Sequence, residues 1–142
     1  MLDVNITVAK QDWKALCRES RTLRVALGAA RKNGEFDKPF HYITGDLSID
    51  GATFAKVGIR KKGFVGSLSN TRPSLKIKLD HTDKSGAVAG WTKLTFNNNQ
   101  QDESLASQFL TYRLANAIGV PAPRVSFARI TVNGKYLGIY SH

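Results

Sequence analysis

Two basic stretches of the chain contain residue types that favour a polyanionic partner. Residues 60–62 read RKK, and Lys76 and Lys78 alternate with apolar residues in residues 74–79 (SLKIKL). Alternate side chains of a strand point to opposite faces, so these two lysines are predicted to share a polar face. Lysine neutralises phosphate charge, and the planar guanidinium of Arg60 can clamp a phosphate or a carboxylate. The alternatives are a solvated strand face for the lysines and an ordinary surface arginine.

The loop between these stretches contains small residues that could cover a phosphate. Residues 63–70 read GFVGSLSN, and Gly63, Gly66, Ser67 and Ser69 are the candidates for such a turn. The pattern is neither G-x-G-x-x-G nor a Walker loop, so an ordinary flexible hairpin loop is the alternative.

Other residue types do not form a recognisable catalytic or metal-binding pattern. His41, His81 and His142 lie far apart, and Cys17 is the one cysteine, so no metal site is predicted from this chain alone. The carboxylates are scattered, and no catalytic acid or base is assigned. Residues 97–99 (NNN) are interpreted as structural, because asparagine side chains bond to nearby backbone and cap helices.

The overall charge favours a polyanionic partner. The formal net charge is +10, while 42% hydrophobic and 23% charged residues are typical of a globular protein. No apolar run approaches the roughly 18 residues that suggest a membrane span. The first residues lack the pattern of a signal peptide, which does not define the compartment.

Hydrophobic spacing predicts the strands and helices that carry the basic residues. Alternation predicts strands at residues 4–8, 47–49, 57–59, 75–79, 91–96, 125–132 and 136–140, with tight turns at Asp50-Gly51 and Asn133-Gly134. A helical spacing includes Trp13, Leu16, Leu23 and Leu27, with Asp12 as its N-cap and Cys17 as a buried apolar residue.

A second helix is predicted to follow the asparagine tract. Asp102 or Ser104 would cap it, and it would run to Ile118 and end at Gly119. Its apolar residues cover most of its circumference, so burial on more than one side is expected. The predicted fold is therefore α+β, an antiparallel-rich sheet with about two helices.

Three ordered groups of residues resemble the CotH kinase family, named for spore coat protein H. They are residues 57–63 (VGIRKKG) with 72–79 (RPSLKIKL), residues 94–99 (LTFNNN) with 102–105 (DESL), and residues 119–124 (GVPAPR) with 132–140 (VNGKYLGIY). The resemblance implies an atypical protein kinase that transfers phosphate from ATP to Ser or Thr of secreted or surface proteins.

The resemblance also implies that two lobes supply different parts of the active site. Residues 1–142 would form one incomplete domain, the N-terminal lobe, with residues 1–39 as a strand–helix extension and 40–142 as the family-like core. ATP and a divalent metal, Mg or Mn, would be the cofactors. The metal-binding and base carboxylates would come from a C-terminal lobe of the same full-length chain, its partner together with the protein substrate.

Within this expectation, Lys76 is the preferred phosphate-contacting lysine, followed by Lys78 and Arg60. One departure concerns Ser107-Gln108, where the family often has Arg-Glu. If that Glu orients the lysine, the pairing is missing here.

A non-catalytic module for coat or surface assembly is therefore the second hypothesis. A basic polyanion-binding module without specific nucleic-acid recognition is the third, and the resemblance implies a secreted, cell-surface or spore-coat location.

Overall fold

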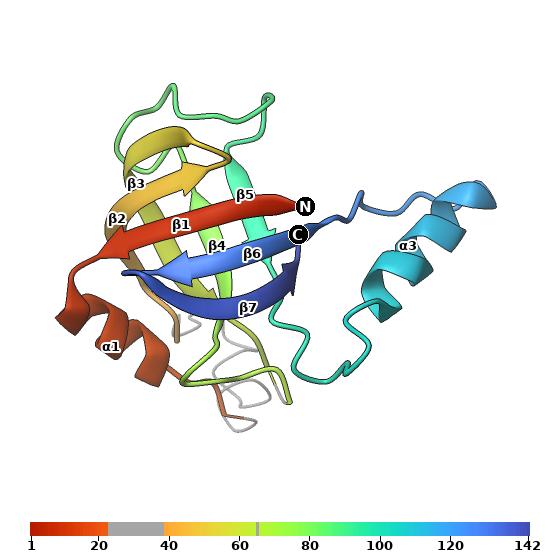
Figure 1. Cartoon of the computed structure of the whole chain (residues 1–142), viewed down its shortest axis with the longest axis horizontal. Helices are drawn as coiled ribbons and strands as arrows, with labels where there is room; N and C mark the ends of the chain where they lie inside the picture. Colours follow the sequence, from red (N-terminus) through yellow and green to blue (C-terminus); the bar gives the residue numbers. More distant parts are fainter. Residues whose placement is uncertain (23–38, 65) are drawn as a thin grey trace, which may run out of the picture.

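The computed structural model describes residues 1–22, 39–64 and 66–142. In chain order, its elements are β1 (Leu2–Val8), α1 (Lys10–Arg18), β2 (Tyr42–Ile49), β3 (Ala52–Lys62), β4 (Ser74–Lys78), β5 (Lys93–Phe96), α3 (Ser107–Ala117), β6 (Phe127–Val132) and β7 (Lys135–Ser141). The α+β prediction is confirmed: the described residues form a mostly antiparallel sheet and two helices (Figure 1).

The strands form one curled sheet in the order β5-β4-β3-β2-β1-β6-β7. Neighbours are antiparallel except β1 and β6, which pair in parallel with Val4 opposite Ile130. Asn97, just after β5, also bridges Ser141 at the end of β7, so the two sheet edges meet at one end. Because β1 lies between β2 and β6, the first residues of the chain are an interior part of the sheet (Figure 1).

Both predicted tight turns form hairpins. Asp50 and Gly51 have φ values of 47° and 89°, and Asn133 and Gly134 have φ values of 49° and 78°. Two successive positive φ values match the twist of the flanking strands, so these turns join β2 to β3 and β6 to β7.

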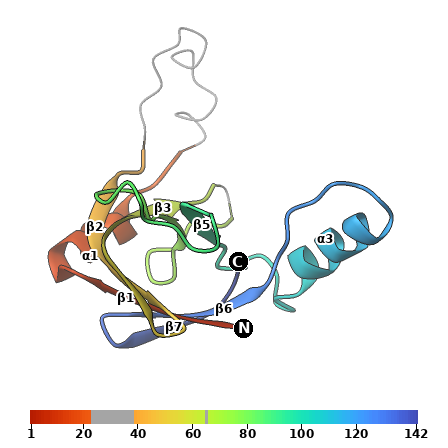
Figure 2. The same cartoon turned by 90° about the horizontal axis from the view of Figure 1, so that it is seen from above.

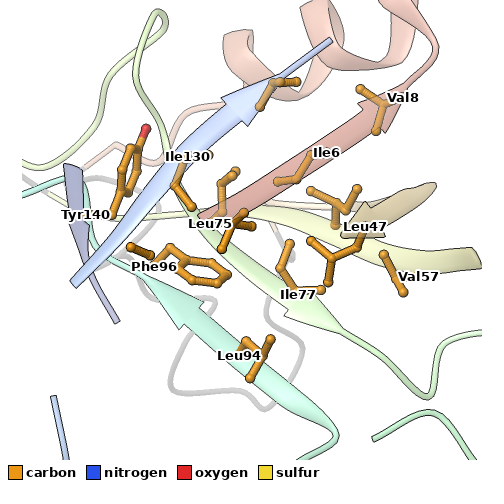
Figure 3. Close-up of a cluster of buried hydrophobic side chains, with 14 of the residues drawn as sticks. Ile6, Val8, Leu47, Val57, Leu75, Ile77, Leu94, Phe96, Ile130 and Tyr140 are labelled. Atoms are coloured by element: carbon orange, nitrogen blue, oxygen red, sulfur yellow. The ribbon is translucent and has the colours of Figure 1, made fainter. Parts of the chain in front are cut away.

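The core lies inside the curl of the sheet, where alternate residues of every strand meet (Figure 3). The cluster includes Ile6, Leu47, Ile59, Ile77, Phe96, Ile130 and Tyr140, all at most 2% exposed. Cys17 of α1 joins it, which confirms its interpretation as a buried apolar residue. Lys61 follows Val57 and Ile59 on the inner face of β3 and is 0% exposed. Its ammonium donates hydrogen bonds to the Cys17 carbonyl at 2.6 Å and to Asn70 Oδ1 at 3.2 Å.

The first helix is shorter than its apolar spacing indicates. It begins after the N-cap Ala9 and ends at Arg18, so Asp12 lies in its first turn and the N-cap prediction was wrong. Leu23 and Leu27, which extended the helical pattern, lie outside the described residues.

The prediction that the second helix is buried on several sides was also wrong. No residue of α3 is buried, and Leu110, Leu114 and Ile118 are 60%, 64% and 68% exposed. Figure 2 shows why: α3 stands apart from the sheet, opposite the side where α1 packs. No helix in the described part of the chain is long and apolar enough to cross a membrane.

The start of α3 combines the two predicted capping groups in an unexpected way. Ala106 occupies the N-cap position. Asp102 nevertheless accepts a hydrogen bond from the Ser107 amide at 2.8 Å, and the Ser104 hydroxyl accepts one from the Ala106 amide at 3.1 Å. These bonds satisfy amides that have no partner within the helix.

Candidate functional site

The outer face of β3 and β4 carries a row of cations. Arg60 pairs with Lys76, Lys62 with Ser74, and Gly58 with Lys78, so the four basic side chains share the face opposite the core. The ion pairs found among the described residues are His41–Glu19 and Arg129–Asp3. Within that part of the chain, none of these four cations therefore has a carboxylate within 4 Å.

Arg60 lies over the ring of Tyr42 further along this face. Its guanidinium carbon is 5.1 Å from the centre of the Tyr42 ring, which is 5.6 Å from the ring of His81. Its buried Nε has no hydrogen-bond partner. Stacking holds the guanidinium plane in place and leaves its polar edge available for an anion.

The loop after β3 uses its hydroxyl groups internally. Ser67 Oγ accepts from the Phe64 amide at 2.9 Å and donates to the Phe64 carbonyl at 3.0 Å. Ser69 Oγ accepts from the Arg72 amide at 2.9 Å. Gly63 has a φ of 136°, and a Cβ there would lie 3.1 Å from Ser67 Oγ. Gly63 and Ser67 thus lie together, whereas Ser69 stabilises its own turn.

A large cavity of about 1070 Å³ opens between the sheet edge and α3. Its lining combines cations, Lys62, Lys93 and Arg124, with the rings of Trp91, Tyr112 and His142, and it contains no Asp or Glu among the described residues. The imidazole of His142 stacks on Phe96 with ring centres 4.8 Å apart, and burial lowers its pKa. The cavity is therefore positively charged and has flat apolar surfaces.

A smaller cavity of about 300 Å³ adjoins it, between the Gly63 loop and the start of α3. Gly63, Ser67 and the asparagine tract line it, together with one carboxylate, Asp102. Three residues line both cavities: Lys62, Asn97 and Gln108. They form the shared wall.

Hydrogen bonds join these three side chains. The Lys62 ammonium donates to Asn97 Oδ1, and Asn97 Nδ2 donates to Gln108 Oε1 at 2.8 Å. Burial lowers the pKa of Lys62, and the like charge of Lys76 lowers it further. The register explains this repulsion, because Lys62 pairs with Ser74 and therefore lies diagonally opposite Lys76 on the same face.

The other two asparagines of the tract are structural, as predicted. Asn98 is buried, and its Nδ2 donates to the Arg72 carbonyl at 2.8 Å and to the Ser67 carbonyl at 3.1 Å. Asn99 Nδ2 donates to Ser141 Oγ at 2.8 Å. Asn97 differs because its side chain connects a strand lysine to α3.

The predicted site residues thus fall into two groups. Gly63 and Ser67 line the smaller cavity, whereas Arg60, Lys76, Lys78 and Ser69 line neither. Sequence reasoning did not name Lys62 as a candidate site residue, although strand alternation puts it on the same face as Arg60. No sequence signal linked Asn97 to Gln108, which only the position of α3 brings together.

The described residues contain no cluster of three or more His, Cys, Asp or Glu side chains that could hold a metal ion. Asp102 already accepts hydrogen bonds from Ser104 and Ser107, which lower its pKa. The site therefore fits an anion and supplies no set of metal ligands.

Comparison with known proteins gives the site a family context. Residues 59–142, more than half of the chain, match the family described as CotH kinase protein. The chain is also similar to an inner spore coat protein H-like protein of Bacillus subtilis (strain 168), at 33% identity over 98 residues. That alignment covers 61% of this chain but 32% of the relative, so the chain spans about a third of the relative's length. The match includes β4 to β7, α3 and both cavities, and the chain belongs to the CotH kinase protein family.

Proposed function

We propose that this chain is the nucleotide-binding N-terminal lobe of a CotH-type protein kinase, which transfers phosphate from ATP to Ser or Thr of secreted or surface proteins. The observation that carries the proposal is the large cavity lined by Lys62, Lys93 and Arg124, to which the described residues contribute no carboxylate. A polyphosphate requires several positive charges, and uncompensated ones bind it most strongly. Trp91 and Tyr112 provide flat surfaces on which a base can stack.

The residues fit the phosphates better than they fit the metal. Phosphoryl transfer depends on positioning and on neutralising charge, which cations in a partly buried cavity supply. A divalent metal, when bound, would supply further positive charge to stabilise the phosphates, and in this proposal its carboxylate ligands and the base would come from a second lobe. In this arrangement Lys62 faces the phosphates from the cavity wall, while Lys76, Lys78 and Arg60 add positive potential from the same face of β3 and β4, outside the cavities.

The exposed side of α3 is the surface on which we place that second lobe. Leu110, Leu114 and Ile118 are spaced four residues apart, so they form one apolar stripe along the helix. The relative is about three times as long as its aligned part, and the further sequence could supply a lobe that covers this stripe.

ATP titration of the chain tests the proposal. Trp91 lines the cavity and the chain has one other tryptophan, Trp13, so fluorescence in a Trp13→Phe background reports on the cavity. Lys62→Met should weaken ATP binding roughly 10- to 100-fold, the equivalent of ~1.5–3 kcal/mol for a charge-assisted hydrogen bond. Lys135→Met, at the remote β6–β7 turn, should bind ATP like the unchanged chain. Absence of saturable ATP binding, or equal weakening by both substitutions, would contradict the proposal.

A non-catalytic role in coat or surface assembly is the second candidate, and Gln108 favours it. A neutral amide occupies the cavity wall where the resemblance implies a carboxylate. The two candidates separate when the chain is joined to the rest of its CotH domain. Phosphate transfer from labelled ATP to an acceptor protein supports the kinase, whereas a complete domain that binds its partner protein without transfer supports assembly.

A further inference from the structure

We infer that Asn97 and Gln108 form a neutral amide relay that positions Lys62 at the junction of the two cavities, so that Lys62, rather than Lys76, is the phosphate-facing lysine. The inference rests on the proposed function for its ligand. It adds a positioning role for two residues and selects one cation among several.

The direction of every hydrogen bond in the relay is determined by the lysine. An ammonium group can only donate, so Asn97 must present its oxygen to Lys62. The NH₂ group of Asn97 then points to Gln108, which must present its own oxygen, at 2.8 Å. Neither amide can rotate by 180° without placing two donors or two acceptors against each other.

The backbone of Asn97 is held as firmly as its side chain. Its amide donates to the Ser141 carbonyl at 2.8 Å, and its carbonyl accepts from the Ser141 amide at 3.0 Å. These bonds close the curled sheet at this end. Lys62 is therefore fixed from two directions, by the closure of the sheet and by α3, whereas Lys76 lines neither cavity.

Because Asn97 and Gln108 carry no charge, the relay affects which anionic ligands the site binds most strongly. A glutamate at position 108 would accept the same hydrogen bond from Asn97 and would keep the relay's direction, but it would add a negative charge. With Gln108, the relay adds no charge, and among the described residues Lys62 has another cation, Lys76, diagonally opposite it across β3 and β4, which lowers the pKa of Lys62. A ligand with several adjacent negative charges offsets the repulsion between Lys62 and Lys76. Because the relay contributes no negative charge of its own, the site favours a di- or triphosphate over a singly charged anion.

Acylation of Lys62, followed by mass spectrometry, measures its free amine directly. Asn97→Asp places a carboxylate next to the ammonium and should slow labelling at pH 8 at least about tenfold, the effect of a pKa rise of one unit. Asn99→Asp adds the same charge two residues away, where the side chain bonds to Ser141, and should slow labelling less than about threefold. Gln108→Glu should give an intermediate decrease, because its charge lies one amide further from Lys62.

Equal labelling rates in Asn97→Asp and Asn99→Asp would overturn the relay. If Asn97→Asp fails to fold, Gln108→Glu tests the relay in its place. An unchanged labelling rate of Lys62 in Gln108→Glu would overturn the relay as well. ATP protection of Lys62 in the unchanged chain tests the ligand separately. A shifted Lys62 rate without ATP protection supports the relay and contradicts the proposed function. ATP protection of Lys76 but not of Lys62 contradicts the choice of lysine.

Discussion

Gly45 offers a sharp test of the sheet, because there is no space for even one more methyl group. It pairs with Val8 of β1 and with Val57 of β3. A Cβ at this position would lie 2.3 Å from Val8 Cγ1, 2.7 Å from the Thr7 carbonyl oxygen and 2.9 Å from Ile59 Cδ1. Val8 can rotate, but the Thr7 oxygen belongs to the backbone of an interior strand and cannot move without disturbing the pairing.

The expected cost of Gly45→Ala is a balance of two effects. Overpacking a well-packed core costs about 1–3 kcal/mol, and the backbone contact favours the upper end. Replacing glycine with alanine restricts the unfolded chain, which stabilises the folded state by about 0.4–1 kcal/mol. The free energy of unfolding should therefore fall by about 2 kcal/mol, which lowers the melting temperature by roughly 7 °C in a chain of this size.

Urea denaturation followed by circular dichroism measures the effect, with Ser48→Ala on the same strand as the control. In the double variant Gly45→Ala/Val8→Ala the nearest clash is removed, so the two substitutions should be non-additive by at least about 0.5 kcal/mol. If Gly45→Ala is neutral or stabilising, or if the two effects simply add, β1 does not pair with β2 in this register.

Three further outcomes are expected. Burial lowers the pKa of Lys61 from its ordinary value of 10.5, so the unfolded state binds more protons between the two pKa values. The wild type should therefore gain stability relative to Lys61→Met as the pH rises from 7 towards 10.5; a constant difference in urea denaturation contradicts this. The chain alone should transfer no phosphate from labelled ATP to a generic acceptor, because in the proposed function the metal-binding and base carboxylates come from the second lobe. Incorporation that survives repurification would disprove the lobe assignment. DNA binding should be weak, non-specific and salt-dependent, and replacing both Lys76 and Lys78 with Gln should reduce the slope of log K against log salt by about 1.8. Tight, sequence-selective binding, or an unchanged slope, would contradict this.

Local features of this protein were predictable from the amino-acid sequence alone. The two turns were predictable because Asp-Gly and Asn-Gly tolerate successive positive φ values, which most residues avoid. The outward direction of Lys76 and Lys78 was predictable because a strand alternates its faces regardless of its neighbours. The family resemblance followed from ordered motifs, and the match over residues 59–142 confirms it.

Tertiary structure decided which faces are covered and which distant residues meet. Apolar spacing in α3 predicted burial, but spacing indicates only that a stripe exists, and α3 contacts the sheet near its start while the stripe stays exposed (Figure 2). Strand alternation put Lys61 on the inner face. Only the packing of α1 against the sheet, however, supplies the Cys17 carbonyl, whose hydrogen bond lowers the energetic cost of burying the ammonium. Lys62, Asn97 and Gln108 are separated by 35 and 11 residues, and they meet because the sheet closes at Asn97 beside the start of α3. Local propensity carries no information about such meetings, which depend on how the whole sheet curls.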